Sequence, residues 1–314
     1  MAVQNSVLTF TVRGFLQVSF LALLGAVAAP AVAATPEETA RQVWAKSPVI
    51  EGHNDTPHQI AEVFDRDFSK FDLNVLPADV LAKTHTDIRA ARAGFLGGQF
   101  WSVYVDAALP KHEVVTRTIQ QIDVVRQMIA RYPDSFAYAS TAAEVEAAMK
   151  AGKIASLIGM EGGHSIGDSL GILRQTYALG ARYMTITHSL TTDWADSATD
   201  APKHDGLAPF GFEVLAEMNR LGMIVDISHV SEATMQDVLD KTTAPVLFTH
   251  SNARAITPHP RNVPDSVLSR LPQNGGVVMV VLLPDYVSEA VRNWSANRAG
   301  EEARLQKLYP YAPD

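Results

Sequence analysis

Histidine and acidic residues recur in this chain at the ends of short apolar runs, and residues of these types are common metal ligands. Each has an ordinary explanation when taken alone, since a His at a strand end is usually a hydrogen-bonded core residue and an Asp there is often a helix N-cap. Together they form a set of imidazoles and carboxylates, the ligands that Zn²⁺ prefers. The sequence has no Cys, which excludes a thiolate-ligated structural zinc site. The residues concerned are His53, Asp55, Glu161, His188, His229 and His250.

The first two of these residues are separated by a single position, as His53-Asn54-Asp55. In an extended strand, side chains at i and i+2 point to the same face, so His53 and Asp55 can both reach one metal ion. A lone His-x-Asp pattern is weak. It becomes informative here because an acid and further His residues follow at the ends of later apolar runs.

The elements that must position these residues alternate along the chain. Short, nearly continuous apolar runs are typical of strands covered on both faces, and stretches with helical spacing separate them. This alternation predicts a parallel sheet with helices outside, as a (β/α)8 barrel of the TIM type or, as the alternative, a doubly wound open sheet. In such barrels the side chains at the carboxyl ends of the strands converge on one mouth. The expected strands are residues 49–50, 95–105, 155–159, 183–188, 223–229, 245–250 and 276–283, and the expected helices are 114–129, 142–149, 207–221 and 232–239.

Only seven strands are visible in the sequence, because a polar helical stretch at residues 288–308 follows the last run. A barrel that lacks a strand has two open edges. We therefore expect a barrel truncated before its eighth strand, unless one strand has escaped the count.

Several long motifs in fixed order resemble the membrane (renal) dipeptidase family of zinc peptidases, which belongs to the amidohydrolase-like metal-dependent hydrolases. The resemblance runs from about residue 40 to about residue 290. The motifs are EGHNDTP (51–57), GGQFWSVYV (97–105), MEGGHSI (160–166), ARYMTITHSLTTDWADS (181–197), EMNRLGMIVDISHVSEATM (217–235) and APVLFTHSNARAITPHPRNVPD (244–265).

The resemblance implies a role for each candidate residue in a dinuclear zinc dipeptidase, where a hydroxide bridging the two ions attacks the peptide bond. Glu161 is the bridging carboxylate, and His188 contacts the scissile carbonyl and its oxyanion. Arg261 holds the terminal carboxylate of the dipeptide, with a surface ion pair to Asp265 as the alternative, and Tyr286 lies near the substrate. The implied zinc ligands are His53, Asp55 and Glu161 for the first ion, and Glu161, His229 and His250 for the second.

Two departures from the family pattern leave alternatives open. Thr56 stands at a commonly apolar position of the H-N-D-x-P motif, which we regard as tolerable. The family's last acidic motif, of the type GSDFDG, supplies a further zinc ligand and proton carrier, and it does not occur before Asp314. His164 is a poor substitute, because Gly162-Gly163 predicts a turn. The alternatives are therefore a catalytically impaired fragment, a zinc- or peptide-binding protein, or another amidohydrolase-type enzyme such as a lactonase or β-lactam hydrolase.

Composition and the first segment limit the partners and the compartment. The net charge of −8 argues against a polyanion such as nucleic acid. Arg13, an apolar run at residues 15–29 and Ala31-Val32-Ala33 predict a cleaved signal peptide over residues 1–33. The alternative, a membrane anchor, needs about 20 apolar residues, more than this run offers. We expect a barrel domain over 34–314 in a periplasmic or secreted protein, with the oligomeric state left open and a homodimer as one option.

Overall fold

The computed structural model describes residues 34–310, and the predicted signal peptide over residues 1–33 lies outside this range. The chain divides into two compact units, Met1–Ala40 and Arg41–Asp314. Helix α1 (Pro36–Lys46) begins in the described part of the first unit, where the Thr35 hydroxyl accepts a hydrogen bond from the backbone N–H of Glu38 at 3.1 Å. The rest of this description concerns the second unit.

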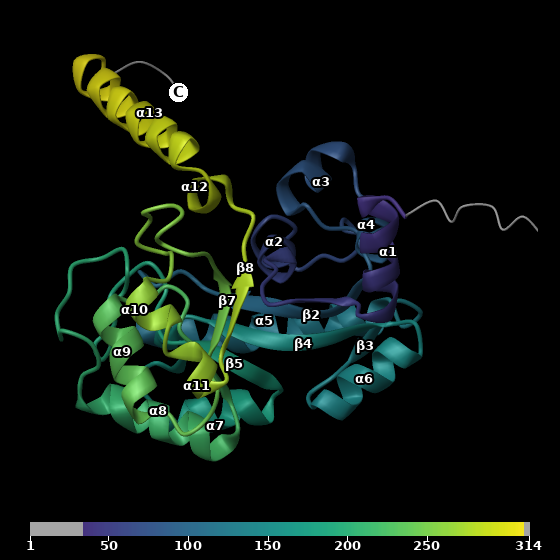
Figure 1. Cartoon of the computed structure of the whole chain (residues 1–314), viewed down its shortest axis with the longest axis horizontal. Helices are drawn as coiled ribbons and strands as arrows, with labels where there is room; N and C mark the ends of the chain where they lie inside the picture. Colours follow the sequence, from purple (N-terminus) through teal and green to yellow (C-terminus); the bar gives the residue numbers. More distant parts are fainter. Residues whose placement is uncertain (1–33, 311–314) are drawn as a thin grey trace, which may run out of the picture. The chain divides into compact units, whose positions relative to one another are not determined.

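Eight strands form one sheet in which every pairing is parallel (Figure 1). Seven of them follow one path, β1-β2-β4-β5-β6-β7-β8, and β3 pairs with the start of β4. The strands are β1 (Val49–Glu51), β2 (Leu96–Tyr104), β3 (Phe136–Tyr138), β4 (Ile154–Glu161), β5 (Ala181–Thr185), β6 (Ile224–Asp226), β7 (Leu247–Ser251) and β8 (Val277–Val280).

Helices connect successive strands and cover the outside of the sheet. Helices α7, α8, α9 and α10 follow one another outside strands β5 to β8 (Figure 1). The longer helices are α5 (Lys111–Arg131), α6 (Ala142–Lys150), α7 (Leu170–Ala178), α8 (Pro209–Leu221), α9 (Glu232–Lys241) and α13 (Glu289–Leu308). The shorter ones are α2 (Thr56–Glu62), α3 (Ala78–Thr84), α4 (Ile88–Ala93), the 3-10 helix η1 (Gly163–Ile166), α10 (Asp265–Leu268), α11 (Leu271–Asn274) and α12 (Pro284–Val287).

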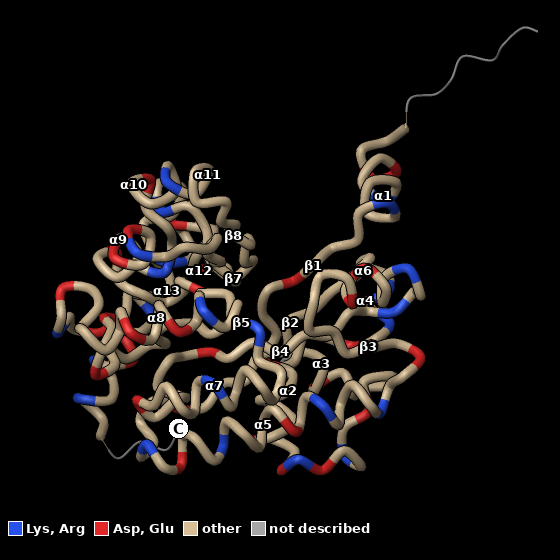
Figure 2. The backbone as a smooth tube through the Cα atoms, turned by 90° about the horizontal axis from the view of Figure 1, so that it is seen from below, with Lys and Arg blue, Asp and Glu red and all other residues tan. Residues whose placement is uncertain are grey.

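Local sequence signals account for where the helices begin and end. The Ser231 side chain accepts a hydrogen bond from the backbone N–H of Thr234 and so caps α9, as the sequence predicts. Gly222 ends α8 with φ at +75°, a conformation that favours glycine. Lys, Arg, Asp and Glu are interspersed along α5 and the outer helices (Figure 2), so these helices face solvent with mixed charge.

The core lies between the sheet and these helices. Strands β2 and β4 are the most buried, and side chains such as Trp101 and Met160 are almost completely enclosed. Covering on both faces explains why these strands read as continuous apolar runs rather than as alternating patterns.

The structure confirms the predicted fold as a TIM-like α/β sheet that is nearly closed into a barrel. The seven predicted runs are the seven strands of the path, and the count missed β3. Because β3 lies beside β4, it does not join the two ends of the path. Within residues 34–310 no pairing connects β8 to β1, and Val280 on β8 is 71% exposed. None of the described helices has the length and apolar character that a bilayer crossing requires.

Candidate metal centre

The candidate ligands come together because all of them lie at, or a few residues after, the carboxyl ends of parallel strands. Glu161 is the last residue of β4 and is almost fully buried. His53 lies two positions after β1, and His250 lies within β7. His188 and His229 each come three positions after a strand, β5 and β6 respectively.

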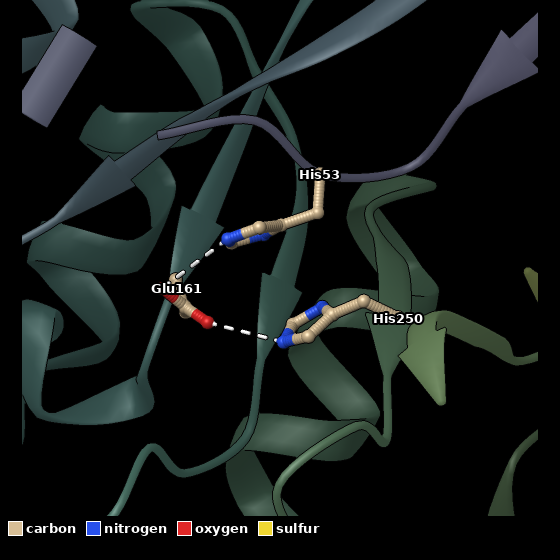
Figure 3. Close-up of side chains that lie close together, drawn as sticks. All are labelled: His53, Glu161 and His250. Carbon is tan, nitrogen blue, oxygen red and sulfur yellow. Dashed lines mark ion pairs between the residues drawn. The ribbon is translucent and has the colours of Figure 1, made fainter. Parts of the chain in front are cut away.

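Glu161 stands at the centre of the group. Its Oε1 lies 3.0 Å from His229 Nε2, 3.4 Å from His250 Nε2 and 3.7 Å from His188 Nε2. Its Oε2 lies 3.7 Å from His53 Nε2. The imidazoles of His53 and His250 approach the carboxylate from two sides (Figure 3).

Asp55 extends the cluster on the side of His53. Its Oδ1 lies 3.2 Å from His53 Nε2, and half of its side chain is exposed. The two residues therefore meet as the i, i+2 spacing predicts, although the strand itself ends at Glu51.

The electrostatics of the cluster keep the Glu161 carboxylate ionised and the imidazoles of His229 and His250 neutral. Burial opposes ionisation of Glu161, but His53 and the bonds from His229 and His250 outweigh it and hold its pKa well below the ordinary value. Burial would also lower the pKa of His53, yet Glu161 and Asp55 raise it to about 9. His229 and His250 have pKa values lowered to about 3, mainly by burial, so both are neutral near pH 7.

This donor set fits divalent metal ions. The nitrogen and oxygen donors of two triads lie within 4.8 Å of one another, namely His53, Glu161 and His250, and Glu161, His188 and His229. Among the described residues, the ion-pairing partners of Glu161 are all imidazoles, and no Lys or Arg forms an ion pair with it. Buried carboxylate and neutral imidazole without thiolate suit Zn²⁺.

The grouping differs in one respect from the predicted ligand sets. His188, predicted to bind substrate, lies as close to Glu161 and His229 as a ligand would, and Asp55 belongs to neither triad. Both arrangements share Glu161 between two groups of imidazoles. The ligand role of each residue remains a prediction.

Backbone conformation helps to aim the side chains. Gly162 has φ at +99°, and a Cβ there would overlap the ring of His164, so the chain turns away sharply after Glu161. His164 points elsewhere, with Nε2 at 2.8 Å from the carbonyl of Val105, which agrees with its predicted exclusion from the ligands. His229 has φ at +67°, and its carbonyl accepts a hydrogen bond from the backbone N–H of Ala198 at 2.7 Å.

Arg261 lies beside this cluster and is only 2% exposed. Its Nη2 donates to the carbonyl of His250 at 3.3 Å, and its guanidinium carbon lies 5.5 Å from the ring centre of Tyr286. Its Nε and Nη1 are buried with no hydrogen-bond partner in the part of the chain that the structure describes. No ion pair with Asp265 is found among the described residues, so the alternative of a surface ion pair is not supported.

Three further residues at the site were missed in the sequence. Tyr104 ends β2, pairs with Glu161 in the sheet register, and has its ring centre 4.4 Å from that of His188. Burial raises the pKa of Tyr104 to about 12, so its phenol stays protonated. Asp226 and Thr249, described below, lie behind the imidazoles. The available signal was position, since both Tyr104 and Asp226 are the last residue of a strand.

The cluster and Arg261 open into one cavity of about 940 Å³. Its lining includes Tyr104 and Tyr286, and Ile50 and Val280 from the two end strands of the sheet. A volume of this order accommodates a small molecule of dipeptide size.

Comparison with known proteins gives concordant results. The family model described as membrane dipeptidase (peptidase family M19) matches residues 37–307. An uncharacterized dipeptidase of Schizosaccharomyces pombe is 41% identical over 272 residues, covering 82% of this chain and 65% of the relative. The chain thus spans less than two thirds of the length of that curated relative.

Solved structures share the fold. The dipeptidase AC, a metallopeptidase of family M19, has a TM-score of 0.67 and 26% identity, covering 77% of this chain and 74% of that one. A metallopeptidase from Rhodobacter sphaeroides was solved with a phosphinate mimic of the dipeptide L-Ala-D-Ala. It has a TM-score of 0.67 and 24% identity, covering 77% of this chain and 76% of that one. At that identity the second likeness supports the fold alone.

Proposed function

Since the chain belongs to the membrane dipeptidase family, peptidase family M19, we propose that it is a zinc-dependent dipeptidase. One observation carries the proposal, which is that a cluster of imidazoles and carboxylates shares a cavity with a buried, partly unpaired guanidinium. The cluster suits a pair of metal ions, and the guanidinium suits a free carboxylate. A dipeptide presents its scissile bond and its terminal carboxylate close together, which matches this arrangement.

The residues that would hold two zinc ions are the predicted sets. His53, Asp55 and Glu161 would hold one, and Glu161, His229 and His250 the other. Bound zinc would polarise the peptide carbonyl and lower the pKa of a water between the ions, so that a bridging hydroxide is available near neutral pH.

The residues of the chain bind and orient the substrate. The unpaired N–H groups of Arg261 are available to donate to a substrate carboxylate, a partner that a planar guanidinium suits better than an ammonium does. Burial lowers the pKa of His188, which is therefore neutral near pH 7 and can donate an N–H to the oxyanion of the transition state. Selection for a free C-terminus follows from Arg261, because an uncharged end would leave the buried guanidinium unpaired.

Export of the protein to the periplasm or the medium stays a prediction based on residues 1–33. Mass measurement of the mature protein purified from a bacterial host tests it, since cleavage after Ala33 would remove those residues.

The test of the proposed activity combines metal reconstitution with matched substrates. Metal-free protein should acquire Ala-Ala hydrolysis on addition of Zn²⁺, and Glu161→Gln should reduce kcat at least about 100-fold. His112→Ala, which removes an exposed imidazole on α5, should leave turnover unchanged. Tight zinc binding without hydrolysis of any dipeptide would favour a zinc- or peptide-binding protein. Equal turnover of Ala-Ala and of a lactone or β-lactam would favour a broader hydrolase.

A further inference from the structure

Asp226, the last residue of β6, is a fully buried carboxylate that the proposed reaction does not use. It accepts four hydrogen bonds. Its Oδ1 receives the backbone N–H groups of Ser228 and Thr249, at 3.1 Å and 3.0 Å. Its Oδ2 receives the hydroxyls of Thr185 and Thr249, at 2.6 Å and 2.8 Å. Burying a carboxylate costs free energy unless hydrogen bonds compensate for the lost water. This complete set of donors therefore indicates that the carboxylate is held in one specific position.

Thr249 links this carboxylate to the metal centre. Its Oγ1 lies 2.8 Å from His250 Nδ1 as well as 2.8 Å from Asp226 Oδ2. A hydroxyl has one proton, and Thr249 donates it to Asp226. The hydroxyl oxygen must therefore accept a hydrogen from His250, which places the imidazole proton on Nδ1 and leaves the Nε2 lone pair directed at Glu161.

The other two imidazoles predicted as zinc ligands lack such a partner. The Nδ1 atoms of His53 and His229 are buried without a hydrogen-bond partner among the described residues. Nε2 of His229 lies 2.8 Å from Nε2 of His250, and because the latter carries a lone pair, His229 must donate its proton there or to Glu161. Among these three, only His250 has its lone pair directed inward by a bond behind the ring.

We propose that Thr249 and Asp226 are positioning residues that hold His250 in the Nδ1–H tautomer and so prepare it as a metal ligand. The proposal rests on the metal-binding part of the proposed function. Outer hydrogen bonds of this kind typically change metal affinity about 10- to 100-fold, because they set both the tautomer and the ring orientation.

The chain offers a matched control in Thr185. Its hydroxyl donates to the same Oδ2 atom of Asp226, at 2.6 Å, and forms no hydrogen bond to a candidate ligand in the described part of the chain. Thr185→Val therefore removes a donor from the buried carboxylate and leaves the link to His250 in place. Thr249→Val breaks that link at nearly constant volume, and Thr249→Ser keeps the hydroxyl.

The first measurement needs no metal. Long-range ¹H–¹⁵N correlation spectra of histidine-labelled, metal-free protein report the tautomer of each imidazole, and His250→Ala identifies the signal. We expect the Nδ1–H form of His250 in the wild type, Thr249→Ser and Thr185→Val, and its loss in Thr249→Val. An Nε2–H form in the wild type overturns the proposal without any variant having to fold.

The second measurement is the Zn²⁺ dissociation constant, obtained by competition with a chromogenic chelator. Thr249→Val should bind the ion about 10- to 100-fold more weakly, and Thr249→Ser and Thr185→Val should stay within about threefold of the wild type. Equal losses in Thr249→Val and Thr185→Val would show a merely structural role. A wild type that binds no zinc but shows the expected tautomer would refute the proposed function and leave the hydrogen-bond relay standing.

Discussion

Replacement of the buried Arg261 by Met should move stability and activity in opposite directions. In the free protein, two of its guanidinium nitrogens are buried and unpaired, and each costs about 1–3 kcal/mol. The variant loses the bond to the His250 carbonyl, about 1.5 kcal/mol, and the contact with Tyr286, about 1 kcal/mol. The balance favours Met by about 1 kcal/mol, which corresponds to a rise in Tm of about 2 °C.

The same substitution should damage turnover of dipeptides. Two charge-assisted hydrogen bonds to the substrate carboxylate are worth about 3 kcal/mol together, which is roughly 100-fold in kcat/KM. Ala-Ala should show this loss, and its C-terminal amide, already a poor substrate, should change little. Arg261→Lys should recover only part of the activity, because an ammonium cannot bind both oxygens in one plane.

Thermal unfolding and steady-state kinetics on the two substrates decide the matter. A fall in Tm of several degrees would show that Arg261 is needed for folding. Equal losses on the dipeptide and its amide would show that the guanidinium does not read the carboxylate.

Four other outcomes follow from the geometry. Removal of metal should lower the free energy of unfolding by about 4 kcal/mol relative to protein in zinc at 1,000 times Kd, measurable as a fall in Tm on dialysis against a chelator. Gly162→Ala should destabilise by about 2 kcal/mol or more, since φ at +99° is strained for Ala and its methyl would meet His164; unchanged denaturant unfolding would contradict this. The pKa of Glu217 is lowered to about 2, mainly by hydrogen bonds from Arg220. The ionised carboxylate therefore stabilises the fold fully at pH values above its unfolded pKa of 4.5, and this stabilisation is lost as the pH falls through about 2. Glu217→Gln should therefore cost about 0.5 kcal/mol at pH 7 and nothing near pH 2, as followed by urea titration at both values, because the Arg partners lie in solvent. Val280→Lys, on the exposed β8, should reduce self-association measured by light scattering, with little change in Tm. The same degree of association in the variant and the wild type would show that this strand edge does not mediate it.

The site could be anticipated from the sequence to the extent that strand order determines it. His53, Glu161 and His250 each stand at the carboxyl end of a strand in a parallel sheet, so their meeting follows from topology alone. Distances within the group do not follow in this way. The placement of His188 beside Glu161 and His229 depends on loop conformation, including the left-handed backbone of His229, which no spacing pattern encodes.

Short elements and outer hydrogen bonds were beyond the sequence for a similar reason. Strand β3 is no shorter than β1 and β6, but unlike them it is not followed by a His within three residues that would mark its end. The role of Thr249 depends on a hydroxyl that donates to a carboxylate and accepts from an imidazole, whereas a Thr in an apolar run indicates only a strand residue. The sequence likewise could not rule out a surface ion pair between Arg261 and Asp265, because burial of a side chain is a property of the whole fold.

The parallel pairing of the sheet has a consequence for how the protein matures. The rings of His53 and His250 lie 4.1 Å apart, although β1 is the first strand of the path through the sheet and β7 is the last but one. Contacts between residues so distant in sequence form slowly, after the intervening strands and helices are in place. A nascent chain that still lacks β7 has no complete metal centre, so metal binding should occur late in biosynthesis. The kinetics of metal uptake during refolding would then report on completion of the sheet itself.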